Sequence, residues 1–552
     1  MKKTKKILVL LLAVMMFASC LAGCKDVDEP AKTNPPDGSV APTQDGSEAT
    51  PAPTEDTSGI KKGGTLVMCV NAEPISLNPD GNYDANNGYL VANLFNQLLK
   101  LDNTSQVVND LATSYEVSED GLSYTFHLHE NVFFCDGVQM TSDDVKFTFE
   151  QILAQSGQAA TRFASLASIE CPDANTVVFK TSVVDASFLY NIASVGTYIL
   201  PRHAYEGKDW VGADAMQTPV GTGPFMFESW DAGSRITLVR NPNYFLGPDL
   251  PYLDKVIFGF VADATTAKAA FLAGDYDILG LPAASDYDEF MANPELKLEK
   301  NIYASRFVVQ FNMAKEPFNN PALRQAVAYA LNKDEMMSMA LKSVGLVSEY
   351  WLGPLFDWAV NKDVKTPGYD LAKAQDLMAQ SGLTKDADGN YLSLTLMTMN
   401  YSPFPEIAEV FKSQMAAIGI KIEISMLEYA SFDEKVVRNK DFEIAITSDY
   451  QGAEVSAIAD TVGTGGYDNC MGFSNAEVDQ LLTDALAAVT FEDRAPHYQR
   501  LQEILAAELP YVPFSEWIGY YPHKTYVINH PGSVEMIGTS AMGEFTYTWL
   551  DN

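Results

Sequence analysis

The stretch that decides the fold of this 552-residue chain reads Leu111-Ala112-Thr113-Ser114-Tyr115-Glu116-Val117-Ser118-Glu119-Asp120-Gly121-Leu122-Ser123-Tyr124-Thr125-Phe126. From residue 123 to residue 129, polar and apolar side chains alternate strictly, which is the period of a half-buried strand. After a short apolar run, Asp136-Gly137 is typical of a turn. Thr141-Ser142-Asp143-Asp144 then begins a helix, since a hydroxyl can cap free backbone N–H groups and acids suit the positive end of the dipole.

Strand and helix signals continue to alternate on both sides of this region. Residues 64–70 form a short apolar strand. Helical patterns are found at 321–340, 371–381, 405–418, 475–488 and 491–508. Strands are expected between these helices, and no short repeat is detectable. The sequence therefore predicts a mixed α/β fold.

Size and charge limit what the chain can be. The globular part begins near Lys61, and the remaining residues can form a large core in two or three domains. The net charge of −35 argues against binding to nucleic acid phosphates. It indicates either a need for solubility or a preference for cationic ligands.

The first 24 residues have the features of an export signal. Four lysines precede an unbroken apolar run at 7–17, which is too short to span a bilayer. Leu21-Ala22-Gly23-Cys24 resembles the bacterial lipoprotein signal, in which the Cys is acylated and becomes the new N-terminus. We therefore expect a signal peptide at 1–23 and a lipid anchor at Cys24, on the extracellular face of the cell membrane. An ordinary cleaved signal, or acylation at Cys20, are the alternatives.

Residues 24–60 are predicted to form a disordered tether. The stretch from Lys25 to Gly59 contains six Pro and no aromatic residue, so it cannot bury enough apolar surface to order itself. A flexible coil of this length reaches about 30 Å. Cleavage before Cys24 removes four Lys and no acid, which takes the net charge from −35 to −39.

The cysteines and histidines give no metal or redox signature. Besides Cys24, the mature chain would keep Cys69, Cys135, Cys171 and Cys470, whose spacing fits neither a CxxC pair nor a zinc site. The sequence does not choose a disulfide pairing, and small buried cysteines are the expectation. The side chains of His127 and His129 could hold a metal together, but no third ligand is evident nearby.

Motifs for catalysis are missing from the sequence. There is no Gly-x-Ser-x-Gly, no phosphate-binding loop and no His-Glu-x-x-His. Asp386-Ala387-Asp388-Gly389 lacks the later Glu of a calcium loop and predicts a turn. We therefore expect a protein that is not an enzyme and that has no cofactor or metal.

The 111–126 stretch resembles the signature of the extracellular solute-binding proteins of family 5, which bind oligopeptides, dipeptides or nickel. Further matches follow in the family's order over about residues 61–552, at Asp136-Gly137, Asp143 to Phe147, Gly221 to Phe225, Arg240 to Phe245, Arg324 to Leu331, Tyr369-Asp370, Lys373-Ala374, Gly382, Phe473 to Asn475 and Val478-Asp479. The chain is thus identified as a member of this family.

The resemblance implies an α/β, periplasmic-binding-protein-like fold with two lobes, of the large class II type with an extra inserted domain. Domain I would take 61–88, 199–309 and 513–552, domain II 89–198, and domain III 310–512. The lobes would close around the ligand by a hinge motion. The closed protein, expected to be a monomer, would be passed to an ABC permease.

The resemblance also implies a peptide site. Peptide-binding members hold the peptide as an added strand, and an Asp of domain III pairs with its α-ammonium. The matching segment here is 446–454, where Asp449 and Tyr450 take the place of the family's Asp-Tyr. The Pro that follows this pair in the family is missing here, so the alignment with the family has a second possible register. In that register Glu454 takes the place of the family's Asp, and Gly452 lies between the two candidate acids. Without ligand, Asp449 is expected to have no partner, so that Asp449→Asn should hardly change melting.

Further site residues are carried over from the family. Glu428-Tyr429 resembles its Glu-Trp, so Tyr429 is expected to line the pocket. Glu73 and Ile75 lie where relatives lend backbone to the peptide. Trp351 lies in a loop that faces the cleft in relatives, although a core tryptophan fits equally well.

We therefore expect a lipid-anchored binding component of an ABC importer, with peptides as ligands and no nucleic acid partner. One alternative is a binder of non-peptide ligands, nickel chelates or oligosaccharides, which the family also includes. The low number of histidines disfavours nickel. The other alternative is an enzyme tethered at the cell wall, which a peptide hydrolysis assay would detect.

Overall fold

The computed structural model describes most of the chain beyond residue 58. The described residues are 59–74, 76–80, 85–103, 105–154, 162–208, 218–280, 282–298, 300–342, 345–531, 536–538 and 543–552. They belong to one compact unit, Ala41–Asn552. The expected signal peptide, the lipidated Cys24, all but the last two residues of the tether, and Ile75 lie outside the described residues and stay predictions.

The first sheet has seven strands in the order β12-β19-β11-β1-β10-β9-β8. Its centre is β1 (Thr65–Val70), which confirms the strand predicted at 64–70 and pairs in parallel with β10 (Lys255–Phe260) and β11 (Ile278–Leu279). The other strands are β8 (Phe225–Asp231), β9 (Arg235–Arg240), β12 (Leu296–Lys297) and β19 (His523–Lys524). The buried apolar residues of β1 and β10 form a core with α2 (Ala85–Leu94).

The second sheet is antiparallel, in the order β4-β5-β7-β6. Its strands are β4 (Ala112–Val117), β5 (Ser123–Leu128), β6 (Leu166–Asp173) and β7 (Thr176–Thr181). Every second residue of β5 is buried, which confirms the alternation in the sequence. Helix α3 (Ser142–Ala154) confirms the helix predicted to begin at 141–144, and it packs on β6 and β7. Its first turn is held by Asp144, which accepts hydrogen bonds from the N–H and hydroxyl of Thr141, rather than by a capping hydroxyl.

The third sheet has the order β14-β18-β13-β17-β15-β16, with β21 beside β13. Its strands are β13 (Lys300–Phe311), β14 (Leu346–Val347), β15 (Leu392–Met399), β16 (Ile420–Leu427), β17 (Ile444–Tyr450), β18 (Tyr511–Tyr520) and β21 (Met536–Gly538). Helix α12 (Phe404–Ala416) packs on β15 and β16. This sheet and its helices contain the most extensive apolar core among the described residues.

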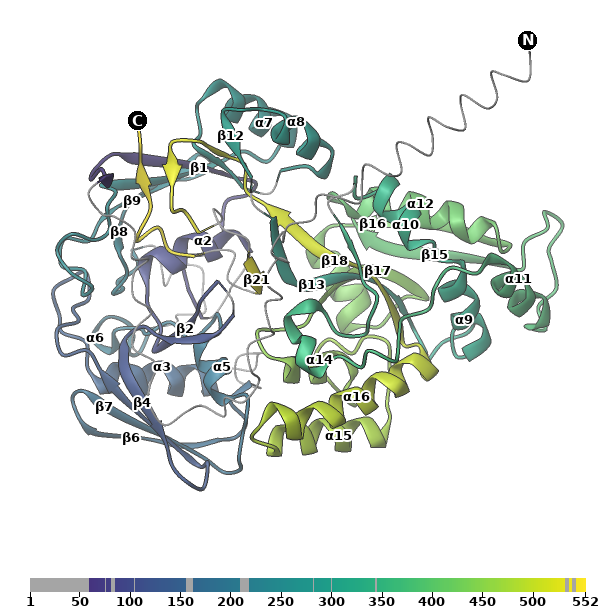
Figure 1. The fold of residues 1–552 in the computed structure, drawn as a ribbon, viewed down its shortest axis with the longest axis horizontal. Coiled ribbons are helices and arrows are strands. Elements are labelled where there is room, and N and C mark those ends of the chain that lie inside the picture. Colours follow the sequence, from purple (N-terminus) through teal and green to yellow (C-terminus); the bar gives the residue numbers. More distant parts are fainter. Residues whose placement is uncertain are drawn as a thin grey trace, which may run out of the picture. The chain divides into compact units, whose positions relative to one another are not determined.

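Two long antiparallel strands, β13 and β18, lie side by side in the third sheet (Figure 1). Each is joined by a few residues to a strand of the first sheet, β13 to β12 and β18 to β19. Two register shifts interrupt their pairing, between Ile302 and Arg306 and between Phe307 and Val308. The expected domain boundaries at 309/310 and 512/513 fall inside these two strands, and the division into three domains stays a prediction.

Most predicted helices are present. They are α11 (Leu371–Gln380), α12, α15 (Ala476–Ala487) and α16 (Phe491–Glu508), and the last two lie side by side (Figure 1). The single helix predicted at 321–340 is wrong: α9 (Pro321–Ala330) and α10 (Lys333–Met339) are separate. The reason is Asn332, whose side chain accepts from the N–H of Glu335 and begins a new helix.

The remaining elements are short. The helices are α5 (Phe188–Ala193), α6 (Arg202–Tyr205), α7 (Ala264–Ala273), α8 (Tyr287–Met291), α13 (Tyr429–Phe432) and α14 (Ile458–Val462). Two small antiparallel sheets of two strands each pair β2 (Leu99–Leu101) with β3 (Val107–Asn109) and β20 (Val527–Ile528) with β22 (Trp549–Leu550).

No helix in the described part of the chain combines the length and apolar character needed to cross a bilayer. The four cysteines of the described region are free thiols, and those of β1 and residue 470 are buried. The predicted turn at 386–389 is present, because the Asp386 carboxylate accepts from the N–H groups of Asp388 and Asn390.

Candidate ligand-binding cavity

A cavity of about 1640 Å³ lies where segments attached to all three sheets meet. Its wall combines residues 71–73 after β1, residues 182–195 after β7, and parts of β13, β17 and β18. Pockets for drug-sized molecules usually measure about 300–1,000 Å³. This cavity is therefore large enough for an extended ligand of several residues.

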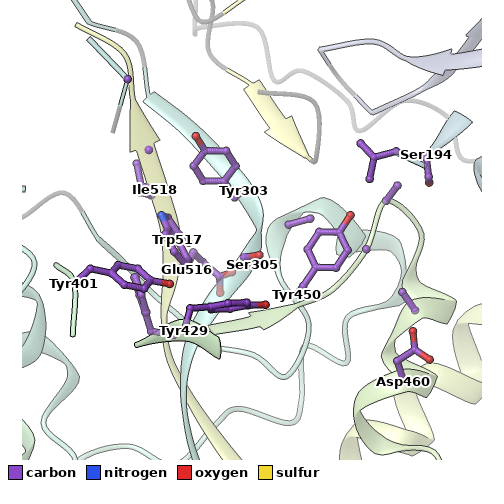
Figure 2. Close-up of a pocket in the computed structure, with 18 of the residues that line it drawn as sticks. Ser194, Tyr303, Ser305, Tyr401, Tyr429, Tyr450, Asp460, Glu516, Trp517 and Ile518 are labelled. Carbon is purple, nitrogen blue, oxygen red and sulfur yellow. The ribbon is translucent and has the colours of Figure 1, made fainter. Parts of the chain in front are cut away.

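Aromatic side chains dominate one side of the cavity. Tyr303 of β13 and Trp517 of β18 come from the two long strands. Tyr401 comes from the loop after β15, Tyr429 from the start of α13 and Tyr450 from the end of β17. Figure 2 shows the rings of these five residues gathered around one space. Trp517 is held in place because it stacks on the buried ring of Phe307, with centroids 4.9 Å apart. Such a wall offers apolar contact area with polar hydroxyl tips.

Charged groups on the wall are mostly acidic. One guanidinium, that of Arg162, and seven carboxylates border the cavity in the described part of the chain: Glu73, Asp185, Asp286, Glu428, Glu454, Asp460 and Glu516. The Arg162 guanidinium donates to the carbonyl of Val195 at 2.9 Å and faces Tyr450 and Asp460. The wall therefore favours cationic ligand groups over anionic ones.

Three of the predicted site residues lie together on the cavity wall, at the end of β17 and in the turn that follows it. They are Tyr450, Gly452 and Glu454. Gly452 has a φ of +75°, and a Cβ at this position would lie 2.4 Å from the Cβ of Ala457, so the turn requires glycine. Glu454 accepts from Arg494 at 2.5 Å and from the N–H of Ser456 at 2.8 Å.

Asp449 is placed differently from its neighbour Tyr450. Successive side chains of a strand point to opposite faces, and Asp449 is only 5% exposed and does not border the cavity. Its carboxylate pairs with the fully buried Arg306 at 3.1 Å and accepts from the hydroxyl of Thr461 at 3.1 Å. The expectation that Asp449 has no partner in the ligand-free protein is wrong, because Arg306 lies directly opposite it on β13.

A buried cluster of charged residues surrounds this pair. Arg306 lies between Asp449 on β17 and Glu516 on β18. Burial raises the pKa of Glu516, which accepts from the hydroxyl of Ser348 at 2.5 Å. Burial, together with the charge of Arg306, lowers the pKa of Lys333 to about 7. The cluster lies behind the cavity wall and reaches the cavity at Glu516.

The other predicted site residues are spread around the cavity. Glu73 borders it and accepts from the indole N–H of Trp230 at 2.6 Å and the N–H of Gly233 at 3.0 Å. Tyr429 also borders it and is 65% exposed. Trp351 is fully buried in the core of the third sheet, with its ring 5.6 Å from that of Tyr511, and it does not border the cavity.

Sequence reasoning missed several wall residues, among them Arg162, Tyr303, Tyr401, Asp460 and Trp517. No motif singles them out. A strand signal at 511–520 could have placed Trp517 on a sheet, but only the pairing of β13 with β18 directs it to the cavity.

Side chains that can ligate a metal are not clustered in the described part of the chain. No group of three or more His, Cys, Asp or Glu side chains suited to a metal occurs among the residues that the structure describes. Two histidine rings, those of His523 and His530, lie with their centroids 4.1 Å apart. Both residues are buried, and neither borders the cavity.

Comparison of the sequence with known families matches residues 106–458 to the family described as "Bacterial extracellular solute-binding proteins, family 5 Middle". The chain is 28% identical over 553 residues to oligopeptide-binding protein AppA of Bacillus subtilis (strain 168), with 95% of each chain covered. It is also 28% identical over 521 residues to heme-binding protein A of Haemophilus influenzae, with 87% of this chain and 93% of the relative covered.

Among solved structures, the oligopeptide-binding protein AppA from Bacillus subtilis in complex with a nonapeptide matches with a TM-score of 0.78. The sequence identity is 26%, and the match covers 89% of this chain and 100% of that chain. This likeness confirms the predicted α/β fold with two lobes of the periplasmic-binding-protein type.

Proposed function

This chain belongs to family 5 of the bacterial extracellular solute-binding proteins, and from that premise we propose that it captures peptides in the cavity for an ABC transporter. The observation that carries the proposal is the cavity of about 1640 Å³, which is bordered by strands β13, β17 and β18 and by an aromatic wall. A similar solved structure holds a nonapeptide. Membership of a solute-binding family supports binding rather than catalysis.

The strand ends at the cavity suit a peptide backbone. An extended peptide can pair with exposed main-chain groups as an added strand, which gives affinity without strict side-chain selection. Tyr450 is the last residue of β17, and both it and Gly452, in the turn that follows, border the cavity. We propose that this turn contacts the main chain of the peptide.

Two acids are proposed for the α-ammonium of the peptide. Glu454 is the first candidate because it borders the cavity, although it already pairs with Arg494. Asp449 is the second candidate. It ranks lower because it lies behind the cavity wall and already pairs with Arg306. A carboxylate has acceptor sites for about four hydrogen bonds, so either acid can add a ligand ammonium to its present donors.

Mass spectrometry of ligand that copurifies with the full chain tests the peptide assignment. We expect peptides, released on denaturation, at close to one equivalent per protein. Recovery of a single non-peptide compound would contradict the proposal. Heme-binding protein A, at the same identity as the oligopeptide-binding relative, supports a non-peptide ligand as the second candidate.

Anchoring by lipid and delivery to ABC permease subunits complete the proposal. The Leu21-Ala22-Gly23-Cys24 sequence supports acylation at Cys24, which would hold the protein at the outer face of the cell membrane. Cells fed a labelled fatty acid should label the wild type, and Cys24→Ala should lose the label because the acylated thiol is gone. Cys20→Ala serves as the control and should keep it; label retained in Cys24→Ala would refute the assignment.

A further inference from the structure

We propose that the cavity selects peptides that carry basic side chains, and that Glu73 and Glu428 receive the cationic ends of those side chains. The inference rests on the proposed peptide-binding function and adds the class of peptide to it.

The cavity wall carries an excess of negative formal charge. Seven carboxylates and one guanidinium border the cavity in the region that the structure describes. A concave site with an excess of one charge concentrates ligands of the opposite charge. The net charge of −35 on the whole chain also attracts cationic ligands.

Protein cations neutralise only part of this acidic wall. Asp286 lies 2.7 Å from the Nζ of Lys268, and Glu454 lies 2.5 Å from the guanidinium of Arg494. Glu516 lies beside Arg306 in the buried cluster. These carboxylates already have a positive partner, so a ligand cation gains less from them.

Glu73 differs because its donors are neutral. The indole N–H of Trp230 and the backbone N–H of Gly233 both donate to Oε1. They fix the orientation of the carboxylate without cancelling its charge. Its Oε2 accepts no hydrogen bond from the described residues, so a lysine ammonium or an arginine guanidinium could bind there at little cost in reorganisation.

Glu428 has the same arrangement on another part of the wall. The side-chain amide of Asn400 donates to Oε1 at 2.5 Å, and Oε2 accepts no hydrogen bond from the described residues. The rings of Tyr401 and Tyr429 border the cavity beside it, and Figure 2 shows both directed into the cavity. Aromatic faces attract cations and also pack against the aliphatic stem of Lys or Arg.

Arg162, the one cation on the wall among the described residues, offers little to an acidic peptide. Arg162 donates to the Val195 carbonyl and faces the carboxylate of Asp460. An acidic side chain entering the cavity would have to compete with that carboxylate and approach the other six. The wall therefore discriminates against negative charge as well as for positive charge.

The test is calorimetry with three matched sets of peptides, three to nine residues long, that differ only at one internal position. That position is Lys, norleucine or Glu. We expect the Lys set to bind about tenfold more tightly than the norleucine set, the scale of one charge-assisted hydrogen bond. The Glu set should bind most weakly. Added salt should weaken the Lys set most, because it screens the attraction.

Variants of the same size but without the charge identify which carboxylates cause the preference for Lys peptides. Glu73→Gln keeps an acceptor for Trp230 and Gly233 and should reduce the Lys preference by about threefold. Glu428→Gln, at a more exposed position, should reduce it by about two- to fivefold. The matched control is Glu423→Gln, an exposed acid on β16, the strand that ends just before Glu428; it does not border the cavity and should change nothing.

The outcomes separate this inference from the proposed function. If norleucine and Glu peptides bind as tightly as Lys peptides, the charge selection is overturned while peptide binding stands. If the Lys preference survives in the double variant Glu73→Gln and Glu428→Gln, the assignment of these two receptors is overturned. If no peptide of any set binds, the proposed function itself fails.

Discussion

Asp449 has a structural role that is separate from any role in ligand binding. Its partner Arg306 is fully buried, so removing the acid leaves a buried cation short of its counter-ion. We expect Asp449→Asn to lower the free energy of unfolding of the ligand-free protein by about 3 kcal/mol, as is typical when one member of a buried pair is lost. Urea denaturation measures this change. Asp376→Asn, at an exposed position on α11, is the control, and an unchanged midpoint for Asp449→Asn would show that the pair contributes nothing.

Lys333 gives the fold a pH dependence. Burial and Arg306 lower its pKa to about 7, whereas an unfolded lysine has an ordinary pKa near 10.4. Between these values the unfolded chain binds the proton and the folded chain does not, so raising the pH stabilises the fold by up to about 1.4 kcal/mol per pH unit. Lys333→Met should flatten the rise in unfolding free energy between pH 7 and 9. Lys412→Met, on the surface of α12, should keep it; parallel curves for all three proteins would refute the shift.

Among the elements, the turn after β17 depends on one residue, Gly452. Gly452→Ala introduces both a positive φ and a contact of 2.4 Å with Ala457, whereas Gly389→Ala introduces only the positive φ, with nothing within 4 Å. The strain at Gly389 should cost about 1–2 kcal/mol. Gly452→Ala should cost more and should also weaken ligand binding, because the displaced turn borders the cavity. Thermal melts and calorimetry compare the two; equal effects on both properties would contradict a special role for the turn.

Elements with strong local signals could be predicted from the sequence. Helix α16 has the predicted bounds because Thr490 caps it and accepts from the N–H of Asp493. Strand β5 follows the alternation of its side chains. The break between α9 and α10 was missed because apolar periodicity runs through Asn332, whose cap interrupts the helix. Periodicity reports burial, and only the side-chain hydrogen bond decides where the backbone changes direction.

The cavity could be predicted only in part, because its walls depend on contacts between distant residues. The resemblance to the family singled out Tyr450, Gly452 and Glu454, and all three border the cavity at or just after the end of β17. The partner of Asp449 lies 143 residues away, and strand pairing alone brings it opposite. Register shifts between β13 and β18 likewise set which of their side chains face the cavity, and no local pattern encodes them.

Ligand binding should stabilise the molecule as a whole, because the cavity draws its wall from segments attached to all three sheets. A ligand that bridges these segments binds the folded chain and finds no equivalent site in the unfolded one. By mass action, a peptide at 100 times its dissociation constant should add about 2.7 kcal/mol to the free energy of unfolding. Thermal shift with a peptide library measures the rise in Tm, and Gly452→Ala should show a smaller rise than Gly389→Ala at equal peptide concentration. Nickel chelates, oligosaccharides and heme provide the comparison. If one of them raises the Tm and no peptide does, the ligand is not a peptide, and the acidic, aromatic cavity serves the alternative instead.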